Sequence, residues 1–238
     1  MAQAVVITGG SAGIGKTAAE RIVSLGYEVV NLDLLDLEQP GVSTYRVDLL
    51  DTETVETVLQ DVLETHEVVG LVNNVGYART ATLLDTDAAL LSKTFALNLT
   101  AAATCARVLV PAMIERGYGR IVNVSSRSAL GRELRTAYAA SKGGLISMTR
   151  VWALELARYG ITSNCVAPGP VATDLFDQMN PDGSDRREKM LADIPVRRVG
   201  TPKDIAHAIG FFLSPESGYV NGQTLYVCGG LSVGVAPV

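Results

Sequence analysis

Tyr138 and Lys142 lie one helical turn apart in residues 137–143, which read Ala-Tyr-Ala-Ala-Ser-Lys-Gly. Residues at positions i and i+4 share one face of a helix. A lysine cation held close to a tyrosine favours the phenolate and lowers the phenol's pKa from its usual value of about 10. Such a phenol can exchange a proton with an alcohol or a carbonyl oxygen. Because this spacing also occurs by chance on exposed helices, the pair predicts proton-transfer chemistry only together with other features of the chain.

A glycine-rich turn follows the first apolar run of the chain, where residues 8–15 read Thr-Gly-Gly-Ser-Ala-Gly-Ile-Gly. Glycines in such a turn allow positive φ angles and let the backbone approach a pyrophosphate closely. The N-terminus of the following helix then offers free N–H groups and a partial positive charge to the phosphates. The turn therefore predicts a dinucleotide site. The residues expected to contact the cofactor here are Gly9, Ser11, Gly13, Ile14 and Gly15.

Asp33 closes the second apolar run and favours NAD over NADP. A carboxylate at this place accepts hydrogen bonds from the adenosine ribose hydroxyls and repels a 2′-phosphate. Ala12 stands directly before Gly13, so no cation is available there for such a phosphate. Lys16 is a cation that argues the other way, but its place inside the helix lets it be solvated. We therefore expect NAD as the cofactor, with NADP as the alternative.

Polar residues also end the third and fourth apolar runs, and these residues are expected to surround the adenosine. Asp48, followed by Leu49, is placed to accept a hydrogen bond from the adenine amino group. Asn74 and Gly76 would let the ribose and the base pack against the backbone. Asp, Asn and Gly are also ordinary turn residues at the end of a strand, which is the alternative interpretation of each position.

The fifth apolar run ends in Ser125 and Ser126, and a hydroxyl here can bond a substrate oxygen and stabilise developing charge. A serine at the end of a strand is more often a turn residue or a helix cap. Asn98 falls in an otherwise apolar helical stretch and must find hydrogen-bond partners if it is buried. It could hold a helix kink, or a water that serves the lysine.

Short apolar runs alternate with longer amphipathic stretches along the whole chain, which predicts a parallel sheet covered on both faces. The expected strands are residues 4–8, 28–32, 44–47, 68–73, 120–124, 162–166 and 223–227. The expected helices are residues 13–25, 52–65, 86–100, 101–116, 137–159 and 202–213. The prediction is an α/β chain with a single-domain Rossmann fold over residues 1–238. Its doubly wound, seven-stranded parallel sheet has helices on both faces, and ligands bind beyond the carboxyl ends of the strands.

Residues 171–195 form a long segment that we expect to be irregular and to act as a substrate lid. The alternative is a mobile surface insertion. An apolar wall for the substrate could come from Leu175, Phe176, Met179, Met190 and Leu191. A guanidinium pairs well with carboxylates and phosphates, so an arginine near the substrate would favour an anionic group. The candidates in the loop before Tyr138 are Arg127, Arg132 and Arg135, although loop arginines are usually just solvated.

Composition excludes several classes of function. The chain has 238 residues, a net charge of −5 and no basic run, which argues against nucleic acid and anionic membranes as partners. No apolar run is expected to reach the roughly 18 residues that a membrane helix needs, and no signal peptide is expected before the first strand. The cysteines Cys105, Cys165 and Cys228 suggest neither a metal site nor a disulfide framework. We therefore expect a cytoplasmic protein that binds no metal.

Over essentially its whole length the chain resembles the short-chain dehydrogenase/reductase family. Residues 8–15 match the family's Thr-Gly-x-x-x-Gly-x-Gly, and residues 73–76 match its Asn-Asn-Ala-Gly with Val75 in place of alanine. The carboxyl-terminal motifs at residues 200–202 and 222–230 resemble the members that are similar to 3-oxoacyl-carrier-protein reductases, although Cys228 stands where the family often has aspartate.

The resemblance implies roles for particular residues. Asn98, Ser126, Tyr138 and Lys142 resemble the family's catalytic tetrad. The loop before Tyr138 is one residue shorter than is common, so Ser125 competes with Ser126, which we prefer because it matches from the strand side. Residues expected beside the nicotinamide are Pro168, Gly169, Val171 and Thr173. Helices at residues 86–116 and 137–159 pair between subunits in the family, so a homotetramer is implied.

The predicted activity is hydride transfer between an NAD nicotinamide and a small secondary alcohol or ketone. Tyr138 would be the acid/base, Lys142 would hold the phenolate and the nicotinamide ribose, and Asn98 would anchor a water leading to solvent. One alternative is an NADP-dependent 3-oxoacyl thioester reductase. Others are a non-catalytic NAD-binding sensor or scaffold, and a methyltransferase that uses the same glycine turn but has no use for the tyrosine–lysine pair.

Overall fold

The computed structural model describes residues 2–234 and contains one parallel sheet with the strand order β3-β2-β1-β4-β5-β6-β7. The strands are β1 Gln3–Thr8, β2 Glu28–Asp33, β3 Val42–Arg46, β4 Glu67–Asn73, β5 Gly119–Val124, β6 Ile161–Pro168 and β7 Thr224–Val227. The chain reverses its direction of winding between β1 and β4, which is where a doubly wound sheet binds its ligand. The predicted seven-stranded Rossmann fold is therefore confirmed.

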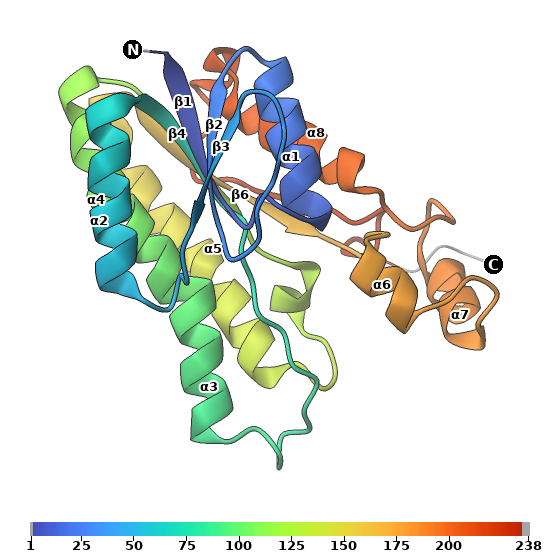
Figure 1. Ribbon diagram of the computed structural model, residues 1–238. Coiled ribbons are helices and arrows are strands. Elements are labelled where there is room, and N and C mark those ends of the chain that lie inside the picture. The colour runs from blue at the N-terminus through green and yellow to red at the C-terminus, as the bar shows by residue number, and fades with distance from the viewer. Residues whose placement is uncertain (1, 235–238) are drawn as a thin grey trace.

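Helices cover both faces of the sheet (Figure 1). On one face lie α1 Gly13–Ser24 and α8 Pro202–Leu213, which pack against each other. On the other lie α2 Thr52–Thr65, α4 Ala101–Arg116 and α5 Thr136–Leu156. Helices α3 Ala88–Phe95, α6 Asp174–Met179 and α7 Asp185–Asp193 extend beyond the sheet. Short turns of 3₁₀ helix lie at Arg127–Leu130, Ala157–Tyr159 and Pro215–Ser217.

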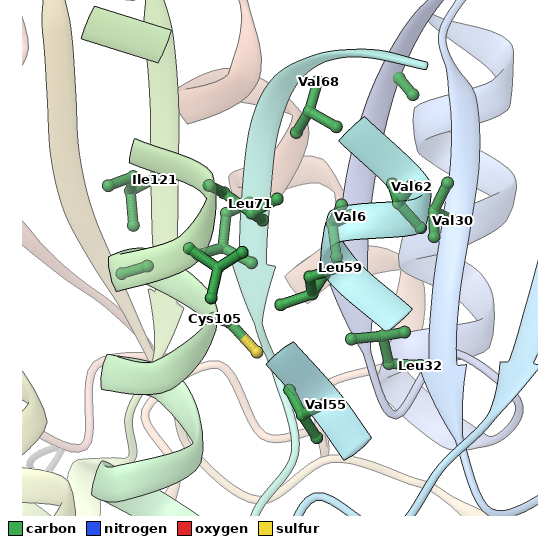
Figure 2. Packing of buried hydrophobic residues seen from close by; sticks show 14 of the residues in the cluster. Val6, Val30, Leu32, Val55, Leu59, Val62, Val68, Leu71, Cys105 and Ile121 are labelled. Carbon is green, nitrogen blue, oxygen red and sulfur yellow. The ribbon is translucent and has the colours of Figure 1, made fainter. Parts of the chain in front are cut away.

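Two hydrophobic cores explain why the strands are continuous apolar runs. Side chains alternate along β1, so that Val6 packs beneath α2 and α4 while Val5 and Ile7 pack beneath α1 and α8. Figure 2 shows the first core, where Leu59 of α2 and Cys105 of α4 meet side chains of the sheet. Truncating a side chain as buried as Leu59 would cost about 2–5 kcal/mol of stability. These cores fix the strands whose ends build the site.

The segment 171–195 is not irregular as predicted, because it contains helices α6 and α7. Both helices begin with a side-chain cap: Thr173 accepts a hydrogen bond from Phe176 N, and Ser184 accepts one from Arg187 N. The break between them falls at residues 180–184, where the turn sequence Asn-Pro-Asp-Gly-Ser stands. Helices this short carry little periodicity, which is why only the cap and turn residues could have revealed them.

The stretches predicted as two helices form one continuous helical rod, Ala88–Arg116, of 29 residues. A π-helical segment, η1 Ala96–Thr100, joins α3 to α4 without a break. The prediction that no stretch has the length and apolarity of a membrane helix was wrong, since the mean hydropathy of this rod reaches 1.5. Half of the residues in that window are buried, and α4 packs on α2 and the sheet, so the rod is a core helix of this fold.

Candidate active site

The carboxyl ends of the central strands and the start of α5 surround one cavity of about 330 Å³. Parallel strands end at the same edge of the sheet, so residues far apart in the chain meet there. The predicted site residues that line this cavity are Ile14, Asn74, Gly76, Ser126, Tyr138, Lys142, Pro168, Gly169, Val171 and Thr173. The structure thus brings three of the four predicted reacting residues and the predicted nicotinamide contacts to a single cavity. The fourth, Asn98, is not among the lining residues.

Lys142 is buried at the floor of the cavity, and its ammonium has one backbone partner. Its Nζ donates a hydrogen bond of 2.7 Å to the carbonyl oxygen of Val124, the last residue of β5. Burial disfavours the charged form and lowers the pKa of this lysine to about 8. The ammonium lies 6.0 Å from the ring centroid of Tyr138. The lysine is therefore tied to the sheet as well as placed beside the phenol.

Burial raises the pKa of the Tyr138 phenol, and three groups oppose that effect. They are the Ser126 hydroxyl, by hydrogen bonding, and the Arg135 and Arg132 guanidiniums, through their charges. The prediction of a lowered pKa for this phenol is therefore wrong in this structure, because burial outweighs the nearby cations.

The two candidate serines have different surroundings. Ser125 is buried, its backbone N–H donates to Val166 O of β6, and its hydroxyl donates to the Lys142 carbonyl oxygen at 2.7 Å. Ser126 is half-buried, and its hydroxyl accepts a hydrogen bond from Ser128 N. The same hydroxyl lowers the pKa of Tyr138 by hydrogen bonding. The geometry therefore favours Ser126 for contact with a substrate oxygen and Ser125 for supporting α5.

Asn98 lies in the π-helical segment and holds neighbouring chain segments together. Its Oδ1 accepts a 2.7 Å hydrogen bond from Tyr77 N, and its Nδ2 donates to Tyr77 O and to Ser141 Oγ. The Ser141 hydroxyl in turn donates to the Tyr138 carbonyl oxygen at 2.8 Å. Both amide hydrogens of Asn98 are thus used by protein atoms, so its side chain has no free donor for the water that we predicted.

The glycine turn has the shape that a pyrophosphate requires. Gly9 and Gly13 adopt positive φ angles of 71° and 51°. A Cβ on Gly15 would lie 1.9 Å from the Gly9 carbonyl oxygen, so only glycine fits there. Helix α1 begins after Ala12, which gives no side-chain cap, whereas α2, α3, α6, α7 and α8 are all capped by side chains. The first N–H groups of α1 are therefore free for an anion.

Of the residues predicted to contact the adenosine, Asp33 and Asp48 have carboxylates that order their own turns, whereas Leu49 has a side chain that is buried. Asp33 ends β2 and accepts hydrogen bonds from Ser11 N at 3.0 Å and Leu35 N at 3.1 Å, which holds its carboxylate beside the glycine turn. Asp48 is exposed and accepts a hydrogen bond from Leu50 N, so it also orders its own turn. The Leu49 side chain is buried in the core, which leaves its backbone as the part that can face a cofactor.

The cavity also has walls that the sequence only partly indicated. Phe176, Met179 and Met190 line it as predicted, whereas Leu191 does not, and the side chain of Leu175 lies outside the described part of the structure. The lining residues that were missed include Asn180 and Arg186. Both come from the segment 171–195, where the charged run at 185–189 was the signal for Arg186. Nothing in the sequence pointed Asn180 toward the cavity.

The fold and this cavity define an oxidoreductase that uses a nicotinamide dinucleotide. Comparison with known proteins supports the same class of oxidoreductase. The family model described as Enoyl-(Acyl carrier protein) reductase matches residues 9–232. The chain is 34% identical to the BbsD subunit of a hydroxy(phenyl)methylsuccinyl-CoA dehydrogenase from Thauera aromatica, over 96% of each chain. It is 36% identical to the 3-oxoacyl-acyl-carrier-protein reductase FabG of Thermotoga maritima, over 96% of this chain and 97% of that protein.

A solved structure of a dehydrogenase has the same fold. The crystal structure of a putative NAD(P)-dependent gluconate 5-dehydrogenase from Beutenbergia cavernae, described with bound NADP at low occupancy, superposes with a TM-score of 0.89. It is 31% identical, and 96% of each chain is covered. The chain belongs to the short-chain dehydrogenase/reductase family, in the branch that includes FabG. It is an oxidoreductase that transfers a hydride between a nicotinamide cofactor and an alcohol or ketone.

Proposed function

We propose that Tyr138 exchanges the proton and Ser126 positions the substrate oxygen in an NAD-dependent alcohol dehydrogenase or ketone reductase. The cofactor supplies the hydride acceptor at C4 of its nicotinamide. In the oxidising direction the carbinol carbon loses a hydride, Tyr138 accepts the hydroxyl proton, and the products are a ketone, NADH and one proton released to solvent. General acid–base catalysis of this kind contributes about 10²–10⁴-fold to a rate.

The observation that carries this proposal is that Ser126, Tyr138 and Lys142 share one cavity with Gly169 and Thr173. An alcohol oxygen between the Ser126 and Tyr138 hydroxyls would place its carbon toward the strand ends where the nicotinamide is expected. Asn98 acts as a positioning residue, because it connects the Tyr77 backbone to Ser141 and so to the first turn of α5.

The preference for NAD rests on Asp33. Its carboxylate is held at the end of β2 by Ser11 N and Leu35 N, where a 2′-phosphate on the adenosine ribose would meet a negative charge. The relative from Beutenbergia cavernae is described with NADP, which supports the opposite choice. Steady-state kinetics with NADH and NADPH decide between them. We expect NADH to be preferred and Asp33→Asn to weaken that preference, whereas a wild-type preference for NADPH would overturn the assignment.

An NADP-dependent 3-oxoacyl thioester reductase is the second candidate, and the similarity to FabG favours it. Acetoacetyl-CoA tested with each cofactor separates the two activities in one assay. If the protein binds NADH but turns over no thioester, alcohol, ketone, hydroxy acid or phosphorylated polyol, a non-catalytic sensor becomes the better description.

The surface supports the proposal of a homotetramer. Phe95 of α3 and Val151 and Leu154 of α5 are exposed apolar side chains on the helices that pair between subunits in the family. Light scattering coupled to size-exclusion chromatography measures the assembly directly. The buried free thiols of Cys105, Cys165 and Cys228 fit the proposed cytoplasmic location.

A further inference from the structure

The cavity that holds Tyr138 has a charge opposite to that of the whole chain. The sequence contains 25 acidic and 20 basic residues. The cavity, however, is lined by the cations Arg132, Arg135, Arg186 and Lys142, and no aspartate or glutamate lies among its lining residues. Because a concave site focuses the field of its charges, this arrangement attracts anions to the place where the reaction occurs.

The arginines at the cavity mouth are not neutralised by carboxylates. Within residues 2–234, no ion pair involves Arg127, Arg132, Arg135 or Arg186. The adjacent Arg187 is the contrast, since it pairs with Asp177 and Asp182. Desolvation, followed by repulsion from Arg135, Arg127 and Arg186, lowers the pKa of Arg132. Clustered guanidiniums that repel one another are stabilised when an anion binds among them.

The loop that carries two of these arginines is held in an unusual conformation. Leu134 has a φ of 61°, a left-handed conformation that costs free energy for a residue with a side chain. Its carbonyl oxygen accepts a hydrogen bond from Ala81 N, which fixes the loop between Arg132 and Arg135. Helix α5 starts after Arg135 without a side-chain cap, so its free N–H groups add positive potential at the same place.

We infer that the substrate carries its own carboxylate or phosphate group, which binds to Arg132 and Arg135 with Arg186 closing over it from α7. This inference rests on the proposed oxidoreductase activity and names its substrate class. The reacting alcohol would lie between Ser126 and Tyr138, and the anionic group would lie at the arginine side of the cavity. The same cavity also has to accept the nicotinamide, so we infer a small substrate that lies between the ring and the arginines.

Asn180 indicates a further feature of that substrate. Its side chain is buried and lines the cavity, and its Nδ2 donates to Phe176 O at 2.9 Å. Its Oδ1 has no hydrogen-bond partner in the described chain. A buried acceptor without a partner is costly, so we expect the amide to turn and present this oxygen to a donor on the bound substrate. The substrate class that fits both features is a short acid with an additional hydroxyl group.

An adjoining groove offers the main alternative. It is lined by Arg127, Arg132, Arg186 and Lys189 with the single carboxylate Asp193. Phosphates of a large carrier such as coenzyme A could bind there while a neutral acyl group enters the cavity. The position of Arg135 in the same cavity as Tyr138 favours the smaller acid, because a carrier bound in the groove does not require Arg135.

The test uses matched substrates with the wild-type protein and NAD. Short hydroxy acids of three to six carbons are compared with their methyl esters and CoA thioesters, and phosphorylated polyols are compared with the free polyols. We expect kcat/KM for the free acid to exceed that for its esters, or kcat/KM for the phosphate ester to exceed that for the free polyol, by about 10–100-fold. This factor corresponds to the free energy of one or two charge-assisted hydrogen bonds. Which of the two anions is favoured identifies the source of the charge.

Variants then assign the preference to residues. Arg132→Gln and Arg135→Gln should each reduce the preference for the anion about tenfold or more while leaving NADH affinity unchanged. Arg158→Gln is the control, since this exposed residue precedes β6 at the opposite edge of the sheet. Asn180→Leu should reduce the advantage of a dihydroxy acid over its deoxy analogue. Equal turnover of acids and esters, or a preference that survives the double arginine variant, would overturn the inference.

Binding measurements keep this inference separate from the proposed function. Succinate and inorganic phosphate are titrated by calorimetry into the protein with NADH bound. Binding that disappears in the double arginine variant supports the anion site even if no substrate in the panel is turned over. Turnover of neutral alcohols and ketones without binding of either anion would support the oxidoreductase activity and reject the anion site. A preference for CoA thioesters alone would assign the arginines to the carrier and also reject it.

Discussion

The ammonium of Lys142 donates its hydrogen bond to the carbonyl oxygen of Val124, which joins the first turns of α5 to the end of β5. The charge is buried, and burial lowers the pKa of this lysine from 10.5 to about 8. At pH 7 the amine is still mostly protonated, so the folded protein holds a buried cation at a cost in free energy relative to the unfolded chain. A group maintained against such a cost is expected to serve the reaction rather than stability.

This relationship predicts how Lys142→Met changes stability with pH. The unfolded chain binds more protons than the folded one between pH 8 and 10.5, so wild-type stability rises with pH in that window. Below pH 8 the full cost of charging the buried amine is present. We expect Lys142→Met to be more stable than wild type at pH 7 by about 1–3 kcal/mol, after allowing for the lost hydrogen bond.

Urea unfolding at pH 7, 9 and 10.5 measures this effect. The stability difference should shrink as the pH rises and should be absent near pH 10.5. Lys16→Met is the matched control, because Lys16 is exposed and its replacement should give no such trend. A Lys142→Met protein that is less stable than wild type at pH 7 would show that the hydrogen bond to Val124 outweighs the desolvation.

Arg135 is expected to set the pH range of alcohol oxidation. Its charge lowers the pKa of Tyr138, whereas burial raises it. Oxidation requires the phenolate, so its rate rises as pH passes through the pKa of Tyr138. Arg135→Gln removes a cation, raises that pKa further and should move the rising limb to higher pH. The pH dependence of kcat gives this shift, with Arg158→Gln as the control; a limb displaced to lower pH would contradict the role of Arg135.

Much of the site could be predicted from sequence because its residues stand at fixed places in a repeated pattern. Gly9, Gly13 and Gly15 precede a helix, and Asp33 and Ser126 follow apolar runs. Because the strands are parallel, their carboxyl ends lie at one edge of the sheet, so residues that follow different strands in the sequence are close together in the fold. The pair of Tyr138 and Lys142 was visible for the same reason, since i and i+4 face the same side of a helix.

The electrostatics could not be predicted in this way, because they depend on side-chain directions. The sequence places Lys142 one turn from Tyr138 but does not reveal that its ammonium bonds to Val124. Likewise, Arg186 lies 51 residues beyond Arg135 in the chain, and only the fold of α6 and α7 brings both to one cavity. The π-helical segment around Asn98 was missed because an extra residue in a helical turn leaves no distinct pattern in an apolar stretch.

Asn98 is predicted to position α5 without contacting the substrate. Asn98→Ala breaks the hydrogen bonds to Tyr77 and Ser141 and leaves buried groups unpaired, which should cost about 1–3 kcal/mol of stability. Because the start of α5 moves, kcat should fall more than the affinity for NADH. Thr100→Ala is the control, an exposed position in the same helical segment. Unchanged kcat in a folded Asn98→Ala protein would show that the connection is not needed for the reaction.

The central claim is that the Tyr138 hydroxyl exchanges the proton with the substrate. The most direct measurement compares wild type with Tyr138→Phe, which removes one oxygen atom and keeps the ring, by single-turnover hydride transfer and by NADH binding. We expect the transfer rate to fall by about 10²–10⁴-fold while the dissociation constant for NADH stays within about twofold, a change below 0.5 kcal/mol. Hydride transfer at the wild-type rate in Tyr138→Phe would contradict the claim.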